Sequence, residues 1–178
     1  ILSELDKDAQ MSGKDLAAAL PVSQIFQAQL APHLIDMKHR VKITSASLES
    51  DNILGDGLNS STLREPELLP LPDIKYALET LLDNADDYAN NLITLDISWN
   101  ATHIVVKLAD DGLGFRPSVM ADVGQPWNSS RQGTAGHRGL GLFLAQTIVE
   151  GRGGSLIVSN QKSGGAEITI TMPLARLV

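Results

Sequence analysis

The segment DIKYALETLLDNADDYAN, residues 73–90, constrains the fold more than any other part of this sequence. Its apolar residues recur at the spacing i, i+3, i+4, i+7 and i+8, which places them in one stripe along an α-helix. Asp73 is predicted to cap the start of this helix. A helix with one apolar face must bury that face against another layer of structure. The stripe consists of Ile74, Ala77, Leu78, Leu81, Leu82, Ala85, Tyr88 and Ala89.

The flanking segments predict that the second layer is a β-sheet. Alternating apolar and polar residues are typical of half-buried strands, and a turn around Asn100 and another at Gly164–Gly165 each join two of them into an antiparallel hairpin. Glycines and prolines between residues 49 and 72 predict loops with room for one short edge strand. Strands are expected at residues 40–48, 93–99, 103–109, 155–160 and 166–174.

Two more helices complete the predicted order of elements. One is expected from about Gln24 to Leu34 with Ser23 as its N-cap, and the other begins at Gly139 and ends within Gly151–Gly154. The order predicts an α+β fold, a two-layer α/β sandwich with about three helices on a mixed, mostly antiparallel sheet. Because this is not a βαβ array, the glycine motifs are not interpreted as a Rossmann fingerprint.

Composition limits the classes of partner. A net charge of −7 and a pI of about 4.9 argue against a nucleic-acid-binding surface. Cysteine is absent, which excludes disulfides and thiol redox chemistry within these 178 residues. The sequence has no apolar run of the roughly 18 residues that a membrane helix needs. We therefore expect a cytoplasmic domain that lies outside the membrane.

The chain is expected to contain one domain, residues 15–178, preceded by part of another module. Ile1, Leu2 and Leu5 have helical spacing and are followed by polar residues and Gly13. Residues 1–14 are therefore interpreted as the tail of an upstream helix with its linker.

The first chemical motif lies on the central helix. At 100° per residue, Asn84 falls at the edge of the apolar stripe together with Thr80 and Asp87. An amide oxygen at this boundary is a suitable ligand for Mg²⁺, which prefers hard oxygen ligands and keeps several waters. The alternative is a polar residue on a solvated helix flank.

The second motif, DDGLGF at residues 110–115, follows a predicted strand directly. A carboxylate fixed at Asp110 can accept from an exocyclic amine, while Gly112 and Gly114 allow the backbone to approach a flat ring. An ordinary strand-ending turn is the alternative, because Asp-Gly is a common turn dipeptide.

The third motif, GHRGLG at residues 136–141, precedes a helix. Free backbone amides and the positive end of the helix dipole can hold phosphate oxygens there, and Arg131 and Arg138 can add charge-assisted contacts. A flexible loop with a glycine helix start is the alternative. The sequence lacks the GxxxxGK[ST] pattern of a P-loop.

Together the three motifs resemble a known family. LETLLDNADDYA, DDGLGF and GLGLFLAQTIVEGRGG are similar to the N, G1 and G2 boxes of the histidine-kinase ATP-binding domain, the Bergerat fold shared with gyrase, Hsp90 and MutL. The likeness covers roughly residues 16–174, including the closing strands GRGGSLIVSN and GGAEITITMPL. VGQPWNSSR, NADDYA and LPVSQIFQAQLAPH further resemble the redox-responsive RegB/PrrB subfamily.

The resemblance implies a role for each matching residue. Asn84 would bind Mg²⁺ and act in catalysis, Asp110 would bind the adenine amine, and Asp87 and Tyr88 would lie near the nucleotide. Residues 116–136 would form a lid over ATP. The other implied nucleotide-binding residues are Gly112, Gly114, Arg131, Gly136, His137, Arg138, Gly139, Leu140, Gly141 and Leu142.

Two positions depart from the family pattern. Many kinases have a second Asn, and gyrase and Hsp90 a water-activating Glu, where this chain has Thr80. Glu79 cannot replace that Glu, because five residues along a helix is about 140° away from Asn84. Asp87 stands where many kinases carry a phosphate-contacting Lys or Arg. We therefore expect phosphoryl transfer without activation of water.

The implied activity is a histidine kinase that uses ATP and Mg²⁺. None of His33, His39, His103 and His137 has the sequence context of the family's phosphoacceptor box, so the acceptor histidine is expected on an upstream domain of the same or the paired protomer. The full-length protein would be a homodimeric inner-membrane sensor that passes phosphate to a response regulator. The alternatives are a degenerate docking module that binds no nucleotide and an anti-sigma-factor-type serine kinase.

Overall fold

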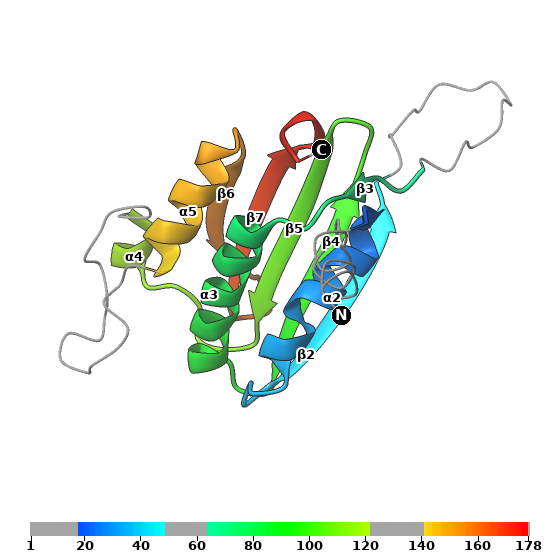
Figure 1. Ribbon diagram of the computed structural model, residues 1–178. Coiled ribbons are helices and arrows are strands. Elements are labelled where there is room, and N and C mark those ends of the chain that lie inside the picture. The colour runs from blue at the N-terminus through cyan, green and yellow to red at the C-terminus, as the bar shows by residue number, and fades with distance from the viewer. Residues whose placement is uncertain (1–17, 49–63, 122–140, 178) are drawn as a thin grey trace, which may run out of the picture.

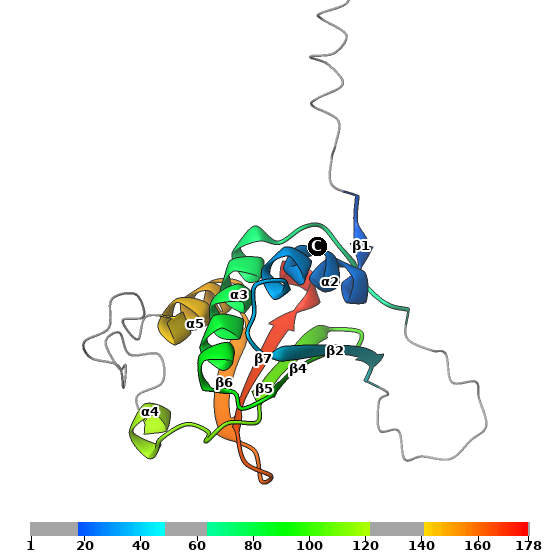
Figure 2. The same ribbon diagram turned by 90° about the horizontal axis from the view of Figure 1, so that it is seen from below.

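The computed structural model describes residues 18–48, 64–121 and 141–177, and it shows a five-stranded sheet with helices on one face (Figure 1). The strands lie in the order β2-β4-β5-β7-β6. Figure 2 shows the same helices above the sheet, and none of the described helices covers its other face, which is called the uncovered face below. The strands are β2 (Arg40–Ser47), β4 (Leu92–Trp99), β5 (His103–Asp110), β6 (Ser155–Asn160) and β7 (Ala166–Pro173).

Three helices form the covering layer, as predicted. They are α2 (Val22–Leu34), α3 (Pro72–Tyr88) and α5 (Gly141–Gly151). A short helix, α4 (Pro117–Ala121), lies to one side of this layer, and a single 3₁₀ turn, η1 (Leu174–Arg176), follows β7 (Figure 1). The predicted two-layer α+β sandwich is confirmed.

The sheet contains one parallel pair. β2 and β4 run parallel, in register from Arg40↔Leu92 to Ser47↔Trp99, and α3 is the crossover between them. The pairs β4–β5, β5–β7 and β6–β7 are antiparallel. The sheet is therefore mixed and mostly antiparallel, and it contains a single β-α-β unit at its β2 edge.

The core lies between the sheet and α3. Every second residue of β4, β5 and β7 is buried and faces the helices, because successive side chains of a strand point to opposite faces. The apolar stripe of α3 packs onto this face. Fully buried residues include Leu78, Leu81, Leu82, Ile93, Leu95, Ile97, Ile104 and Val106.

The helix starts differ from the predicted caps. α3 begins at Pro72 with Leu71 as N-cap and no side-chain cap bond, so the prediction of Asp73 as the cap is wrong. Proline is favoured at the first helical position because its fixed φ suits the helix and its missing N–H leaves no donor unsatisfied. Asp73 instead accepts from Arg152 Nε at 2.7 Å and Nη2 at 2.8 Å, which joins the start of α3 to the end of α5.

The predicted start of α2 is also wrong. The helix begins at Val22 with Pro21 as its N-cap, so Ser23 lies within its first turn, where the Ser23 N–H donates to Glu65 Oε1 at 2.6 Å. The preceding residues form β1 (Leu20–Pro21), which pairs antiparallel with β3 (Glu67–Leu68). The short strand expected between residues 49 and 72 therefore exists, but in a separate two-stranded sheet.

Several predictions fall outside the described ranges. Residues 1–14 and the part of the expected lid from residue 122 to 136 belong to these segments. Within the three described ranges, no helix combines the length and the apolar character that a membrane crossing requires.

Candidate functional site

The C-terminal end of α3 lies directly against the turn after β5. A Cβ built on the buried Gly112 would lie 2.1 Å from the main-chain oxygen of Tyr88, closer than any side chain allows. Only glycine fits here, since the opposing atom belongs to the backbone. The first two sequence motifs, on α3 and at DDGLGF, are thus brought together.

Asp110 ends β5 with a buried carboxylate, and only 6% of the residue is exposed. Its Oδ1 accepts from the Gly112 N–H at 2.8 Å and from the Ala166 N–H at 3.3 Å. Both bonds go to Oδ1, and Oδ2 can accept from a ligand. A buried, oriented carboxylate can select an N–H donor such as an exocyclic amine.

Asp111, the next residue, has a different role. Its carboxylate accepts backbone N–H bonds from Asn90 at 2.8 Å, Asn91 at 2.9 Å and Leu92 at 3.2 Å. These bonds, that from Asn91 foremost, lower the pKa of Asp111 to about 2. Asp111 therefore remains ionised and ties the DDGLGF turn to the connection between α3 and β4.

Asn160, at the end of β6, holds the other half of DDGLGF. Its Oδ1 accepts from the Phe115 N–H at 2.6 Å, and its Nδ2 donates to the Phe115 oxygen at 2.9 Å. Gly114 has a φ of +78°, and a Cβ there would lie 2.7 Å from Asn160 Oδ1. The second glycine of the motif is thus required both by its conformation and by this contact.

The start of α5 contacts α3 at Thr80, upstream of Tyr88, where α3 contacts the DDGLGF turn. A Cβ on Gly141 would lie 2.9 Å from Thr80 Cγ2, and the Thr80 hydroxyl donates to the Tyr76 oxygen at 2.8 Å. Leu142 is half-buried beside it. Of the third motif the structure describes only Gly141, because Gly136, His137, Arg138, Gly139 and Leu140 lie outside the described ranges, as does Arg131.

Asn84 lies on α3 between these two contacts. It is half-buried and stands four residues after Thr80, which meets α5, and four residues before Tyr88, whose oxygen meets Gly112. Residues four apart are neighbours on a helix surface. Asn84 thus lies between the α3 contact with Gly141, the end of the GHRGLG motif, and the α3 contact with the DDGLGF motif. These two motifs are distant from each other in sequence.

Asp87 and Tyr88 follow on the last turn of α3. Asp87 Oδ1 lies 3.2 Å from Lys38 Nζ, so an exposed cation accompanies this carboxylate. Tyr88 is 46% exposed. The sequence offered no signal for Lys38, because the loop before β2 meets the helix only in the folded chain.

Asp86 was not predicted to matter, yet it is buried and anchors that loop. Its carboxylate accepts from the Lys38 N–H at 2.9 Å and the His39 N–H at 2.8 Å, and lies 2.9 Å from His39 Nδ1. Burial opposes its charge, but these bonds outweigh burial and lower the pKa of Asp86. A carboxylate on the core-facing flank of an amphipathic helix was the only sequence signal for this contact.

Asn84 offers an amide oxygen, a type of ligand that Mg²⁺ accepts. In the described part of the chain, no three acidic or histidine side chains cluster in a way that would hold a metal ion by themselves. Mg²⁺ commonly takes one or two protein oxygens and completes its shell with substrate phosphates and water. A single amide oxygen from Asn84 suits that mode.

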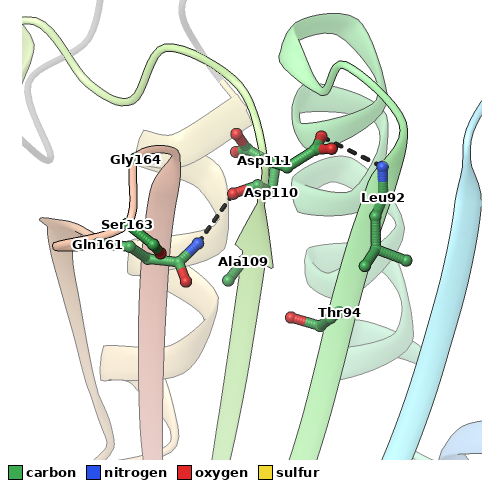
Figure 3. Close-up of a pocket in the computed structure, with 8 residues that line it drawn as sticks. All are labelled: Leu92, Thr94, Ala109, Asp110, Asp111, Gln161, Ser163 and Gly164. Carbon is green, nitrogen blue, oxygen red and sulfur yellow. Dashed lines mark hydrogen bonds between the residues drawn. The ribbon is translucent and has the colours of Figure 1, made fainter.

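A pocket also lies on the opposite face of the sheet, away from the helices. Figure 3 shows it with the strands in front of the helices and with Gln161 reaching toward Asp110. Leu92, Thr94 and Ala109 belong to the uncovered face, because the residues beside them in each strand face the core. The pocket is lined by Leu92, Thr94, Ala109, Asp110, Asp111, Gln161, Ser163 and Gly164.

Comparison with known families settles the relationship of this chain. Residues 71–176, from the residue before α3 to the end of η1, match the model described as "Histidine kinase-, DNA gyrase B-, and HSP90-like ATPase". The chain belongs to this ATPase family. The predicted family resemblance is therefore confirmed, and the three motifs stand in the segment that carries it.

Relatives of this ATPase domain are sensor kinases. The chain is 30% identical over 135 residues to the sensor histidine kinase RegB of Cereibacter sphaeroides, over 65% of the chain and 29% of RegB. It is 26% identical over 181 residues to sporulation kinase B of Bacillus subtilis, over 97% of the chain and 40% of that kinase. The chain thus spans less than half the length of either relative, and it is an ATPase domain of the sensor histidine kinase type.

A solved structure supports the fold of the ATPase domain. The mycobacterial sensor histidine kinase MprB matches with a TM-score of 0.62 at 16% identity, over 88% of this chain and 96% of that one. At this identity the likeness concerns the fold alone.

Proposed function

We propose that the chain binds Mg²⁺-ATP beside α3 and transfers the γ-phosphoryl group to a histidine of a separate phosphoacceptor domain. The observation that carries this proposal is the placement of Asn84 between the contacts that α3 makes with Gly112 and Gly141. The buried Asp110 carboxylate is evidence for a base with an exocyclic amine at the Gly112 end of the site. Family membership supports ATP as the nucleotide.

Each residue would contribute position or charge. Asp110 would accept from the adenine amine, Gly112 and Gly114 would admit the ring, and Asn84 would hold Mg²⁺ beside the phosphates. Mg²⁺ would neutralise charge on the phosphates. Phosphoryl transfer depends mainly on such positioning and electrostatic stabilisation. The imidazole of the acceptor forms the new N–P bond as ADP leaves.

The remaining contacts would come from the α5 side. We propose that Gly136, His137, Arg138, Gly139, Leu140, Gly141 and Leu142 surround the phosphates and that Arg131 adds charge. Asp87 opposes phosphate binding, and Lys38 at 3.2 Å offsets part of that effect.

For the whole protein we propose a homodimeric, membrane-attached sensor that relays phosphate to a response regulator. The 30% identity to RegB supports a redox-responsive member of that group. Residues 15–178 would be its catalytic domain, and residues 1–14 the tail of its dimerisation and phosphoacceptor helices.

Calorimetry tests the nucleotide site. We expect the chain to bind ATP with an affinity that falls when EDTA removes Mg²⁺. Asp110→Asn should weaken ATP binding about 10- to 150-fold, since it breaks a hydrogen bond to a charged group. Asn84→Ala should abolish the magnesium dependence.

Lys107→Ala, an exposed change on the uncovered sheet face, is the matched control and should bind ATP like the parent. Circular dichroism verifies that each variant is folded. A folded chain that binds neither ATP nor ADP would overturn the proposal and indicate a docking module instead.

A further inference from the structure

The main-chain oxygen of Asp110 lies where the β5–β7 ladder ends. The last paired residues are Ala109 and Glu167, one position before Asp110 and one after Ala166. A buried carbonyl without a partner is costly, so the end of a ladder needs another donor. The side chain of Gln161 supplies it.

Gln161 Nε2 donates to the Asp110 main-chain oxygen at 2.8 Å (Figure 3). It also donates to the Ala166 oxygen at 3.4 Å. One amide thus joins the carbonyls of the two residues that follow the ladder. The Ala166 N–H in turn donates to Asp110 Oδ1. Because Gln161 holds Ala166, it also influences the position of the Asp110 carboxylate.

The turn that carries Gln161 is closely fitted to Asp110. The Gln161 N–H donates to the Gly165 oxygen at 2.9 Å, and its oxygen accepts from the Gly164 N–H at 3.1 Å. A Cβ on Gly165 would lie 1.9 Å from the Asp110 oxygen, and its φ is +96°. The β6–β7 turn therefore fixes the amide of Gln161 next to the Asp110 carbonyl.

We propose that Gln161 is a positioning residue for base recognition, which rests on the proposed nucleotide site. By holding the Asp110 and Ala166 carbonyls, it fixes the direction of the Asp110 carboxylate and so sets the preference for adenine over a base without the amine. Gln161 lines the pocket on the uncovered face of the sheet, whereas the proposed nucleotide site lies beside α3. Its effect on base preference must therefore pass through Asp110.

The test compares Mg²⁺-ATP with Mg²⁺-ITP, which carries an oxygen in place of the exocyclic amine. Gln161→Met keeps the side-chain length but removes the donor. We expect ATP affinity to fall about two- to tenfold, the usual range for one neutral hydrogen bond, with ITP affinity unchanged. The ratio of the affinity for ATP to the affinity for ITP should fall by the same factor.

Two further variants separate positioning from a merely structural role. Gln161→Lys retains a donor of similar reach and should keep a wider ATP-to-ITP ratio than Gln161→Met. Ser163→Ala, in the same turn and pocket, should match the parent. If Gln161→Met does not fold, Gln161→Asn replaces it and should also narrow the ratio.

A ratio unchanged in Gln161→Met, even with reduced thermal stability, would overturn the inference and leave the nucleotide site standing. If the parent chain binds ATP and ITP equally, and Asp110→Asn binds ATP as tightly as the parent, both the inference and the adenine role of Asp110 would be overturned.

Discussion

Asp110 and Asp111 are neighbours with different roles because their carboxylates have different hydrogen-bond partners. The Asp110 carboxylate lies on the helix side, where its Oδ1 is held by two N–H groups. The Asp111 carboxylate is held by the backbone between α3 and β4. One acid is thus suited to a ligand, and the other stabilises the fold.

Asp111→Asn should show this role through the pH dependence of stability. The pKa of about 2 in the folded protein lies below its ordinary value of 3.8, so ionised Asp111 stabilises the protein above about pH 4. That stabilisation is lost as the pH falls through the folded pKa. Urea unfolding should show the variant to be less stable by a constant amount between pH 5 and pH 8, with the difference shrinking between pH 4 and pH 2.5. An equal difference at pH 3 and pH 7 would contradict this role.

The sequence could predict Asp110 but not the residues that orient it. A carboxylate before Gly-x-Gly at a strand end is a local pattern and can be read directly. Asn160 ends β6 and Gln161 follows it, and their partners Phe115 and Asp110 lie 45 and 51 residues away. Such contacts depend on sheet register, which no short pattern encodes.

At the scale of elements, α3 is held at both ends. Arg152 binds Asp73 near the helix start, while Asp86 binds the 38–39 loop and Tyr88 abuts Gly112 near its end. Asn84 lies between these anchors. The helix therefore presents Asn84 from a fixed backbone.

Asp86→Ala should destabilise the protein by about 1–3 kcal/mol, because it leaves the Lys38 and His39 N–H groups without their buried acceptor. Glu79→Ala on the same helix is the matched control. Glu79 pairs with Lys75 at 2.5 Å, an (i, i+4) pair of the kind that contributes only about 0.3–0.5 kcal/mol. Guanidinium unfolding of both variants measures the difference, and equal losses would count against Asp86 as an anchor.

Helix existence could be predicted from periodicity, but helix starts could not. The apolar stripe was sufficient to predict α3, because burial of one face stabilises a helix there. The cap predicted at Asp73 failed because its carboxylate has a tertiary partner, Arg152, and the cap predicted at Ser23 failed because α2 already begins at Val22. Local capping preference is weaker than such contacts.

At the scale of the whole molecule, the sheet has one covered and one uncovered face. Leu95→Ala should cost about 2–5 kcal/mol, because Leu95 is fully buried between β4 and the helices. Ile157→Ala should cost less than about 1 kcal/mol, because Ile157 is 61% exposed on the other face. Thermal unfolding of the two apolar truncations compares the faces directly, and similar losses would contradict a one-sided core.

The sandwich was predictable from the order of elements, whereas the parallel pairing of β2 with β4 was not. Hairpins such as β4–β5 follow from two strands and a short turn. β2 and β4 are separated by α3 and the segment before it, so their direction and register are fixed only when the helix packs.

The anchoring of α3 bears on how substrate and product are distinguished. ATP and ADP share the adenine that Asp110 would hold, and they differ only in the phosphate at the other end. Since α3 with Asn84 is fixed against the turn that carries Asp110, Asp110 would bind the base of both nucleotides in the same way. In the proposed site, ATP and ADP would then be distinguished at the phosphate end, by Asn84 and by the α5 side, where Gly141 meets Thr80.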